Sequence, residues 1–160
     1  MELPGGACLL VLNDQGQALI VPRPNKADSV CMPGGKVEAG ETFAQAMVRE
    51  VREETGLSIT EDRLFELFRS PCVGDGGAPR YDVTCFVLLD TVATIPGPEE
   101  PDLEARFDDP AVLLTHSPFA EYNREALEAF LAVLPALVAE GKTNVNPSVC
   151  AASIEAALLV

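Results

Sequence analysis

Three carboxylates stand at helical spacing about one third of the way along the chain. Glu53 and Glu54 follow Glu50 by three and four residues, so on a helix the three side chains lie within ~6 Å of one another. Like charges at that distance raise one another's pKa unless a cation lies between them. Mg²⁺ takes one or two carboxylates and leaves its other positions to water and phosphate. The spacing therefore indicates a divalent-metal site, and Arg49 is close enough to orient Glu53.

The neighbouring residues predict the helix that would carry these carboxylates. Thr42 and Gln45 form the pattern of a capping box, and Gly56 stands where a left-handed residue ends a helix. The stretch before the helix, VCMPGGKVEAGE at 30–41, contains too much glycine to be helical. We therefore expect a glycine-rich loop followed by an acidic helix face.

The segment from Gly35 to Leu57 resembles the Nudix box, GX5EX7REUXEEXGU, in which U is an aliphatic residue. It reads GKVEAGETFAQAMVREVREETGL and matches at Gly35, Glu41, Arg49, Glu50, Val51, Glu53, Glu54, Gly56 and Leu57. At average residue usage, an accidental match in a chain of this length is roughly a 10⁻⁷ event. The motif is thus far more specific than a short glycine pattern.

The resemblance implies both a fold and a chemistry. The implied fold class is α/β: the Nudix fold, an α/β/α sandwich with a central mixed β-sheet. The implied activity is hydrolysis of a nucleoside diphosphate linked to another group, with Mg²⁺, or Mn²⁺ as a substitute, and attack of water on a phosphorus. In such chemistry the metal neutralises phosphate charge and lowers the pKa of bound water, while the protein positions and deprotonates.

Each matching residue acquires a role from the same resemblance. The implied metal ligands are Glu50, Glu53, Glu54 and a backbone carbonyl of the Gly34–Gly35 pair. Arg49 resembles the residue that orients Glu53, and Glu41 resembles a support for the loop. Gly35, Glu41 and Gly56 are then structural members of the motif.

The general base is left open by the resemblance, because some family members use a glutamate of the box and others a carboxylate from a loop before the last strand. Here that loop is EEPDLEARFDD at 99–109, in which Glu104 is the best-placed candidate and Asp102 the second. Glu50 and Glu53 are the candidates within the box. An acidic loop of this kind can also be a solvated segment without a catalytic role.

Candidate substrate-binding residues lie on both sides of the motif. Arg23 and Lys26 precede the glycine-rich loop and could reach substrate phosphates, although a pair of surface charges is an equal alternative. Asn123 fits the N-cap of the last long helix. It also stands where some MutT-like members of the family place an asparagine that reads the base, since an amide can bond a purine edge in two places.

Apolar patterns predict the elements around the motif. Residues 7–12 and 18–22 form the pattern of a hairpin, and 64–68 and 82–89 are further expected strands. The segment 96–110 is expected to be a long loop with one short strand at its end. A helix is expected from Asn123 to Gly141, kinked or divided at Pro135, followed by a short apolar helix in the last residues.

Length and these elements predict the domain organisation. We expect a Nudix domain over 1–141 and a C-terminal extension over 142–160 that either covers the core or forms a dimer contact.

Composition limits the partners of the protein. The 160 residues include 11 basic and 25 acidic side chains, for a net charge of −14, which argues against extended nucleic acid and against an anionic membrane surface. The five cysteines are scattered and there is one histidine, so zinc and a disulfide framework are not expected. The amino-terminal run lacks a basic region, and the expected location is the cytoplasm.

The expected function is hydrolysis of a normal or oxidised nucleoside triphosphate, as ribo- or deoxyribonucleotide, to the monophosphate and pyrophosphate. An alternative substrate is ADP-ribose or another nucleotide sugar. A further alternative is a Nudix-fold module that binds a nucleotide without cleaving it, although such proteins usually lose carboxylates of the box. The 5′ end of an RNA is a third possibility.

Overall fold

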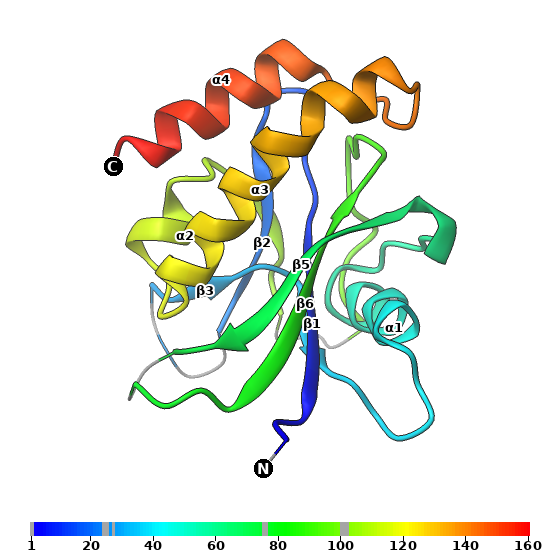
Figure 1. Ribbon diagram of the computed structural model, residues 1–160, viewed down its shortest axis with the longest axis vertical. Coiled ribbons are helices and arrows are strands. Elements are labelled where there is room, and N and C mark those ends of the chain that lie inside the picture. The colour runs from blue at the N-terminus through cyan, green and yellow to red at the C-terminus, as the bar shows by residue number, and fades with distance from the viewer. Residues whose placement is uncertain (1, 24–25, 27, 75–76, 100–102) are drawn as a thin grey trace.

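Two β-sheets lie between helices in this protein (Figure 1). The computed structural model describes residues 2–23, 26, 28–74, 77–99 and 103–160. The first sheet has the strand order β4-β1-β6-β5 and consists of β1 (Gly5–Leu10), β4 (Gly34–Lys36), β5 (Leu64–Cys72) and β6 (Tyr81–Leu88). The second has the order β3-β2-β7 and consists of β2 (Ala18–Pro22), β3 (Val30–Cys31) and β7 (Arg106–Asp108).

The first sheet is mixed. Strands β1 and β6 are parallel, whereas β4 pairs with β1, and β5 with β6, in the antiparallel sense. This confirms the expected mixed α/β fold. The strands expected at 64–68 and 82–89 correspond to β5 and β6, and the short strand expected at the end of the 96–110 loop is β7.

The predicted hairpin of 7–12 and 18–22 is present only at its turn. Asn13 N donates to Gln17 O at 3.0 Å, and Leu12 and Ala18 form an isolated bridge. Beyond that point the strands diverge, and β1 pairs with β4 and β6 while β2 pairs with β3 and β7. The physical reason is burial on both faces, because Leu9, Leu10 and Val11 are all fully buried, and a strand buried on both sides favours a central place in a sheet.

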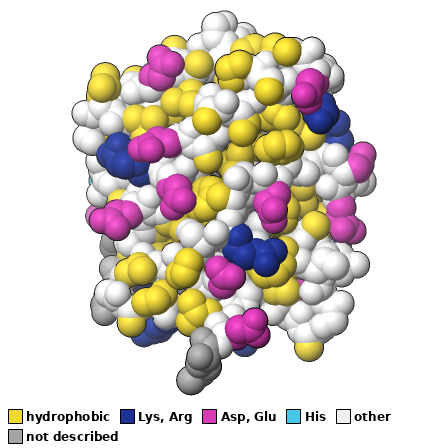
Figure 2. Space-filling model, in the orientation of Figure 1, with side chains coloured by type: hydrophobic (Ala, Val, Ile, Leu, Met, Phe, Trp, Pro, Cys, Tyr) yellow, Lys and Arg dark blue, Asp and Glu magenta, His cyan; other side chains and the backbone are white. Residues whose placement is uncertain are grey.

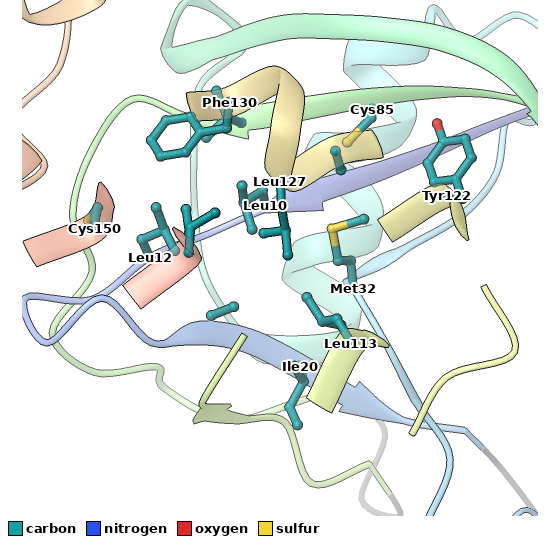
Figure 3. Packing of buried hydrophobic residues seen from close by; sticks show 14 of the residues in the cluster. Leu10, Leu12, Ile20, Met32, Cys85, Leu113, Tyr122, Leu127, Phe130 and Cys150 are labelled. Atoms are coloured by element: carbon teal, nitrogen blue, oxygen red, sulfur yellow. The ribbon is translucent and has the colours of Figure 1, made fainter. Parts of the chain in front are cut away.

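Helices cover the sheets on opposite sides. On one side lies α1 (Phe43–Thr55), and on the other lie the short α2 (Val112–Thr115) and the long α3 (Ala120–Ala139) (Figure 1). A 3-10 turn, η1 (Glu61–Arg63), leads into β5. The two sides correspond to two apolar clusters, one containing Met47 and Val51 of α1 and the other containing Leu127 and Phe130 of α3. Figure 3 shows the second of these clusters.

The prediction that Asn123 begins the last long helix is wrong. Helix α3 begins at Ala120, so Asn123 lies within it and is buried at 2% exposure. The Ser117–Pro118 pair explains the earlier start, because Ser117 Oγ accepts from Phe119 N at 3.2 Å and orders the turn before the helix. Pro135 lies inside α3 and does not divide it.

The last segment forms a helix, as expected, and packs against the core. Helix α4 (Pro147–Leu158) begins at Asn146, whose side chain accepts from Val149 N. Cys150 and Ile154 of α4 are fully buried in the same cluster as Phe130. Figure 1 shows α4 lying across α3 at the upper end of the molecule.

Acidic side chains are spread over the face shown in Figure 2, and basic side chains are fewer there. None of the helices within the described part of the chain is long and apolar enough to span a membrane.

Candidate functional site

Helix α1 has the ends that the sequence predicts. Thr42 Oγ1 accepts from Gln45 N at 3.0 Å, and Gln45 Oε1 accepts from Thr42 N at 2.9 Å, which completes the capping box. Gly56 ends the helix with φ +77°. Because a side chain at Gly56 would also collide with the carbonyl oxygen of Gly97, glycine is required at this position for two reasons.

Arg49 joins the glycine-rich loop to the carboxylates of α1. Its guanidinium donates to both carboxylate oxygens of Glu41, from Nε at 2.8 Å and from Nη2 at 2.9 Å. Its Nη1 donates to Glu50 Oε1 at 2.9 Å and to Glu53 Oε2 at 3.4 Å. Nη2 also donates to the carbonyl of Lys36 at 3.0 Å. Such forked contacts with carboxylates require the planar guanidinium of an arginine.

Strand β4 passes directly against the same carboxylates. Gly34 N donates to Glu54 Oε1 at 2.8 Å. A Cβ on Gly35 would lie 2.6 Å from the carboxylate carbon of Glu50, and a Cβ on Gly34 would collide with the carbonyl oxygen of Ala7. Both glycines are therefore needed for the close approach of β4 to α1 and β1.

The electrostatics of the carboxylates differ from one residue to the next. Partial burial raises the pKa of Glu50, an effect that Arg49 partly opposes. The hydrogen bonds from Arg49 lower the pKa of Glu41 to about 2, and the contacts with Glu41 raise the pKa of Arg49. Arg49 offsets only part of the cost of burying the charged Glu50 carboxylate. A divalent cation bound nearby would stabilise that negative charge.

These residues fit a divalent cation as a partial set of ligands. Within the described residues, no three side chains of the types His, Cys, Asp and Glu are grouped closely enough to hold a metal ion by themselves. Mg²⁺ does not need such a cage, because it is commonly bound by one or two carboxylates together with water and substrate phosphate. Glu50 and Glu54 supply carboxylate oxygen of the required kind beside the backbone of Gly34 and Gly35.

A cavity of about 520 Å³ adjoins the carboxylates at β4, within the size range of small-molecule sites. Its described lining includes Gly34 and Gly35 and four of the chain's 11 basic residues, and no carboxylate. The basic residues are Arg23, Lys26, Lys36 and Arg80. In a chain with a net charge of −14, this concentration of positive charge favours an anionic ligand.

All three candidate substrate-binding residues line this cavity. Arg23 and Lys26 reach it from the loop after β2, and Asn123 reaches it from α3. The guanidinium of Arg23 lies 5.4 Å from the centre of the Phe119 ring, which also lines the cavity. Asn123 therefore combines burial in a helix with access to the cavity.

Three cysteines also line the cavity, a position that the sequence alone does not indicate. These are Cys8, Cys31 and Cys72. All five cysteines are free. Burial raises the pKa of Cys31 to about 12 and that of Cys72 to about 11, so both thiols are neutral at pH 7. The register of β1 on β4, which sets Cys8 opposite Gly34, is a signal that only the structure supplies.

Among the described residues, no hydrogen bond or ion pair joins Glu104 to the carboxylates of α1. Glu104 is exposed and lies two residues before β7, and no hydrogen bond or ion pair among the described residues involves it. Its role as general base stays a prediction. Asp102, the second candidate in that loop, falls outside the described residues.

The chain belongs to the Nudix family of hydrolases, because the family model described as NUDIX domain matches residues 2–130. It is similar to an ADP-ribose pyrophosphatase of Methanocaldococcus jannaschii, with 32% identity over 51% of this chain and 48% of that protein. It is also similar to an 8-oxo-dGTP diphosphatase of Haemophilus influenzae, with 40% identity over 38% of this chain and 46% of that protein. The chain thus spans about half the length of these curated relatives.

Solved structures confirm the fold. A Nudix hydrolase from Nitrosomonas europaea superposes with a TM-score of 0.63 over 80% of this chain and 90% of that one, at 19% sequence identity. At this identity the likeness concerns the fold alone. The Nudix family resemblance and the mixed α/β fold are therefore confirmed.

Proposed function

We propose that this protein is a Mg²⁺-dependent pyrophosphohydrolase that converts a normal or oxidised nucleoside triphosphate to the monophosphate and pyrophosphate. One observation carries the proposal: the carboxylates of Glu50 and Glu54 meet the glycines of β4, and the same glycines line a cavity whose described charged side chains are all basic. A polyphosphate could thus lie between a metal site and a cationic cavity.

Glu50 and Glu54 would hold the metal together with Glu53 and the carbonyl of Gly34. When bound, Mg²⁺ or Mn²⁺ would neutralise phosphate charge and lower the pKa of a coordinated water. Arg49 holds the Glu50 and Glu53 carboxylates in place through Nη1. Glu53 is one-third exposed and can accept a proton from water, as can Glu104 or Glu50, the other candidates for the general base.

Arg23 and Lys26 are proposed to bind substrate phosphates, and Asn123 to contact the base. All three line the cavity, which supports this assignment over a role as surface charges for the two basic residues. The similarity to an 8-oxo-dGTP diphosphatase favours a nucleoside triphosphate.

ADP-ribose or another nucleotide sugar is the second candidate substrate. The similarity to an ADP-ribose pyrophosphatase, which extends over 51% of this chain, favours it. The linkage broken and the metal site would be the same, and the group beyond the second phosphate would differ.

Hydrolysis of a nucleotide panel tests the proposal. Nucleoside triphosphates, 8-oxo-dGTP, ADP-ribose and nucleotide sugars are incubated with Mg²⁺, with Mn²⁺ or with EDTA, and products are separated by chromatography. We expect metal-dependent release of a monophosphate and pyrophosphate from a triphosphate, with ¹⁸O from labelled water on one product identifying the phosphorus attacked. Nucleotide binding without hydrolysis of any compound would instead support a non-catalytic module.

The remaining assignments concern the setting of the enzyme. Five free cysteines support a reducing compartment such as the cytoplasm. The boundary between a domain at 1–141 and an extension at 142–160, and a homodimer contact through that extension, stay predictions that sedimentation of the full chain would address.

A further inference from the structure

Two cysteines are paired in register at the centre of the first sheet. Cys8 of β1 and Cys85 of β6 are partners in the parallel ladder, and both side chains pack in the apolar cluster on the α3 side. Neighbouring strands lie about 4.7–4.9 Å apart, and a disulfide joins residues whose Cα atoms are about 4.4–6.8 Å apart. The register therefore holds these two thiols at a separation that a disulfide can span.

The two thiols differ in their access to solutes. Cys85 is fully buried, whereas Cys8 is partly exposed and lines the cavity. The neighbouring Cys8 thiol, together with burial, raises the pKa of Cys85, so the two sulfur atoms interact. A small solute in the cavity therefore reaches Cys8 first, and Cys85 is the thiol behind it.

Cys8 also adjoins the carboxylates of α1 through β4. On the edge of β1 opposite to β6, Cys8 is the register partner of Gly34. A Cβ on Gly34 would lie 2.9 Å from Cys8 Cα, so the two backbones are in tight contact. Gly34 N in turn donates to Glu54 Oε1 at 2.8 Å. A displacement of Cys8 would therefore act directly on the glycine that holds Glu54.

We propose that Cys8 and Cys85 are a modification site, at which hydrogen peroxide joins the two thiols in a disulfide that inhibits nucleotide hydrolysis. The inhibition rests on the proposed function, whereas formation of the disulfide does not. The Cys8 sulfur, after loss of its proton, attacks one peroxide oxygen and becomes a sulfenic acid as the O–O bond breaks. The Cys85 sulfur, after loss of its proton, attacks the Cys8 sulfur as the S–O bond breaks. In total, two thiols and one hydrogen peroxide give one disulfide and two waters.

The other cysteines provide a matched control. Cys72 lines the same cavity but pairs with Tyr81, which is four residues from Cys85 along β6, or about 13 Å at the rise of a strand. Among the described strands, no other two cysteines are register partners. Cys72→Ala thus removes a thiol of the cavity and leaves the pair intact.

Peptide mapping tests the disulfide directly. The natural chain, Cys8→Ala, Cys85→Ala and Cys72→Ala are treated with hydrogen peroxide, alkylated and digested with trypsin without reduction. Trypsin leaves each cysteine on a separate peptide: Cys8 on 1–26, Cys31 on 27–36, Cys72 on 70–80, Cys85 on 81–106 and Cys150 on 143–160. Circular dichroism shows whether each variant is folded, and either of the two pair variants alone suffices for the test.

Hydrolysis is measured before oxidation, after it and after addition of dithiothreitol. Dithiothreitol reduces a disulfide but does not restore an oxidised methionine such as Met32, which also lines the cavity. Recovery of the rate with dithiothreitol therefore assigns the inhibition to thiol chemistry.

We expect peptides 1–26 and 81–106 to be linked in the natural chain and in Cys72→Ala. Hydrolysis by both should fall at least about tenfold as the link forms, since small displacements of catalytic groups are costly, and should recover with dithiothreitol. Neither Cys8→Ala nor Cys85→Ala should give the link, and Cys8→Ala should keep its own rate after peroxide.

Three results would overturn the inference: no link between the two peptides, a linked protein that keeps the natural rate, or equal reversible inhibition in Cys8→Ala. If the reduced chain hydrolyses no nucleotide, the proposed function alone fails. The same peptides then still decide whether the disulfide forms, and calorimetric binding of ADP to the oxidised and reduced chain decides whether it reaches the cavity, with equal affinities counting against the inference.

Discussion

Glu54 accepts a hydrogen bond from Gly34 N, so its carboxylate is held at the boundary of α1 and β4. Replacing it in Glu54→Gln keeps an oxygen that can accept this bond and removes the negative charge. We expect the fold to be retained and kcat to fall at least about hundredfold, the scale of loss for a removed catalytic group. Steady-state kinetics with the best substrate and Mg²⁺ measure the effect.

Glu61→Gln is the matched control, because Glu61 lies on the exposed η1 turn and, among the described residues, its side chain makes no hydrogen bond or ion pair with α1. It should keep the natural rate. A Glu54→Gln protein with the natural kcat would contradict the assignment of Glu54 as a metal ligand.

Glu41 provides a pH-dependent contribution to stability. Its pKa is lowered from 4.5 to about 2 by the hydrogen bonds from Arg49, so the folded state binds its proton less readily than the unfolded state. Such a group stabilises the fold above its unfolded pKa, and the contribution is lost as pH falls through the folded pKa. The window is therefore about pH 4.5 down to about pH 2.

Urea unfolding of the natural chain and of Glu41→Gln across this window tests the linkage. We expect the natural chain to be more stable at pH 6, and the difference between the two proteins to shrink as the pH approaches 2. A difference that does not vary with pH would show that the contact acts through packing and not through charge.

Single residues also show how far sequence reasoning extends into the site. The spacing of Glu50, Glu53 and Glu54 predicts a shared helix face because helical geometry is local. The orientation of the Asn123 amide could not be predicted, because it depends on a carbonyl ten residues away in another helix. The cavity-facing side of Cys31 likewise depends on which sheet its strand joins.

At the scale of elements, the end of α1 and the loop that follows β6 are joined at Gly56. Gly97 N donates to Thr55 O at 3.0 Å, and the carbonyl oxygen of Gly97 occupies the space where a side chain at Gly56 would be. We expect Gly56→Ala to lower the free energy of unfolding by more than the ~1–2 kcal/mol that a left-handed alanine costs.

Gly40→Ala is a matched control for this element, because Gly40 has a similar φ of +83° with no atom within 4 Å of an added Cβ. It should show the backbone cost alone. Urea unfolding of both variants gives the difference, and equal losses would mean that the contact with Gly97 does not matter.

Helices and strands were predicted correctly where their sequence pattern is local. The prediction was wrong where strands far apart in the sequence pair with each other. The capping box of α1 and the apolar runs of β5 and β6 are short-range signals, and all three elements were expected. The hairpin of β1 and β2 was wrong beyond its turn, because strand pairing is decided by burial on both faces and by partners as far away as β6. The start of α3 was missed because Ser117 acts as the stronger turn former.

At the scale of the whole molecule, the net charge is −14. The excess acidic side chains repel one another in the compact state, and this repulsion destabilises the fold. Added salt screens exposed charges beyond about 10 Å at 0.1 M. We expect the free energy of unfolding to rise by about 1 kcal/mol between 10 mM and 150 mM NaCl, or about 2–4 °C in Tm. Thermal unfolding at pH 7 measures this, and a fall in Tm would show that attractive pairs outweigh the net repulsion.

The parallel pairing of β1 with β6 has a consequence for folding. Gly5 to Leu10 align with Asp82 to Val87, so the centre of the first sheet cannot close until more than half of the chain is available. Loop closure over such a separation precedes any gain from the contact, and sheets built this way fold slowly. During synthesis, the edge of β1 that pairs with β6 must therefore stay unpaired until β6 emerges from the ribosome.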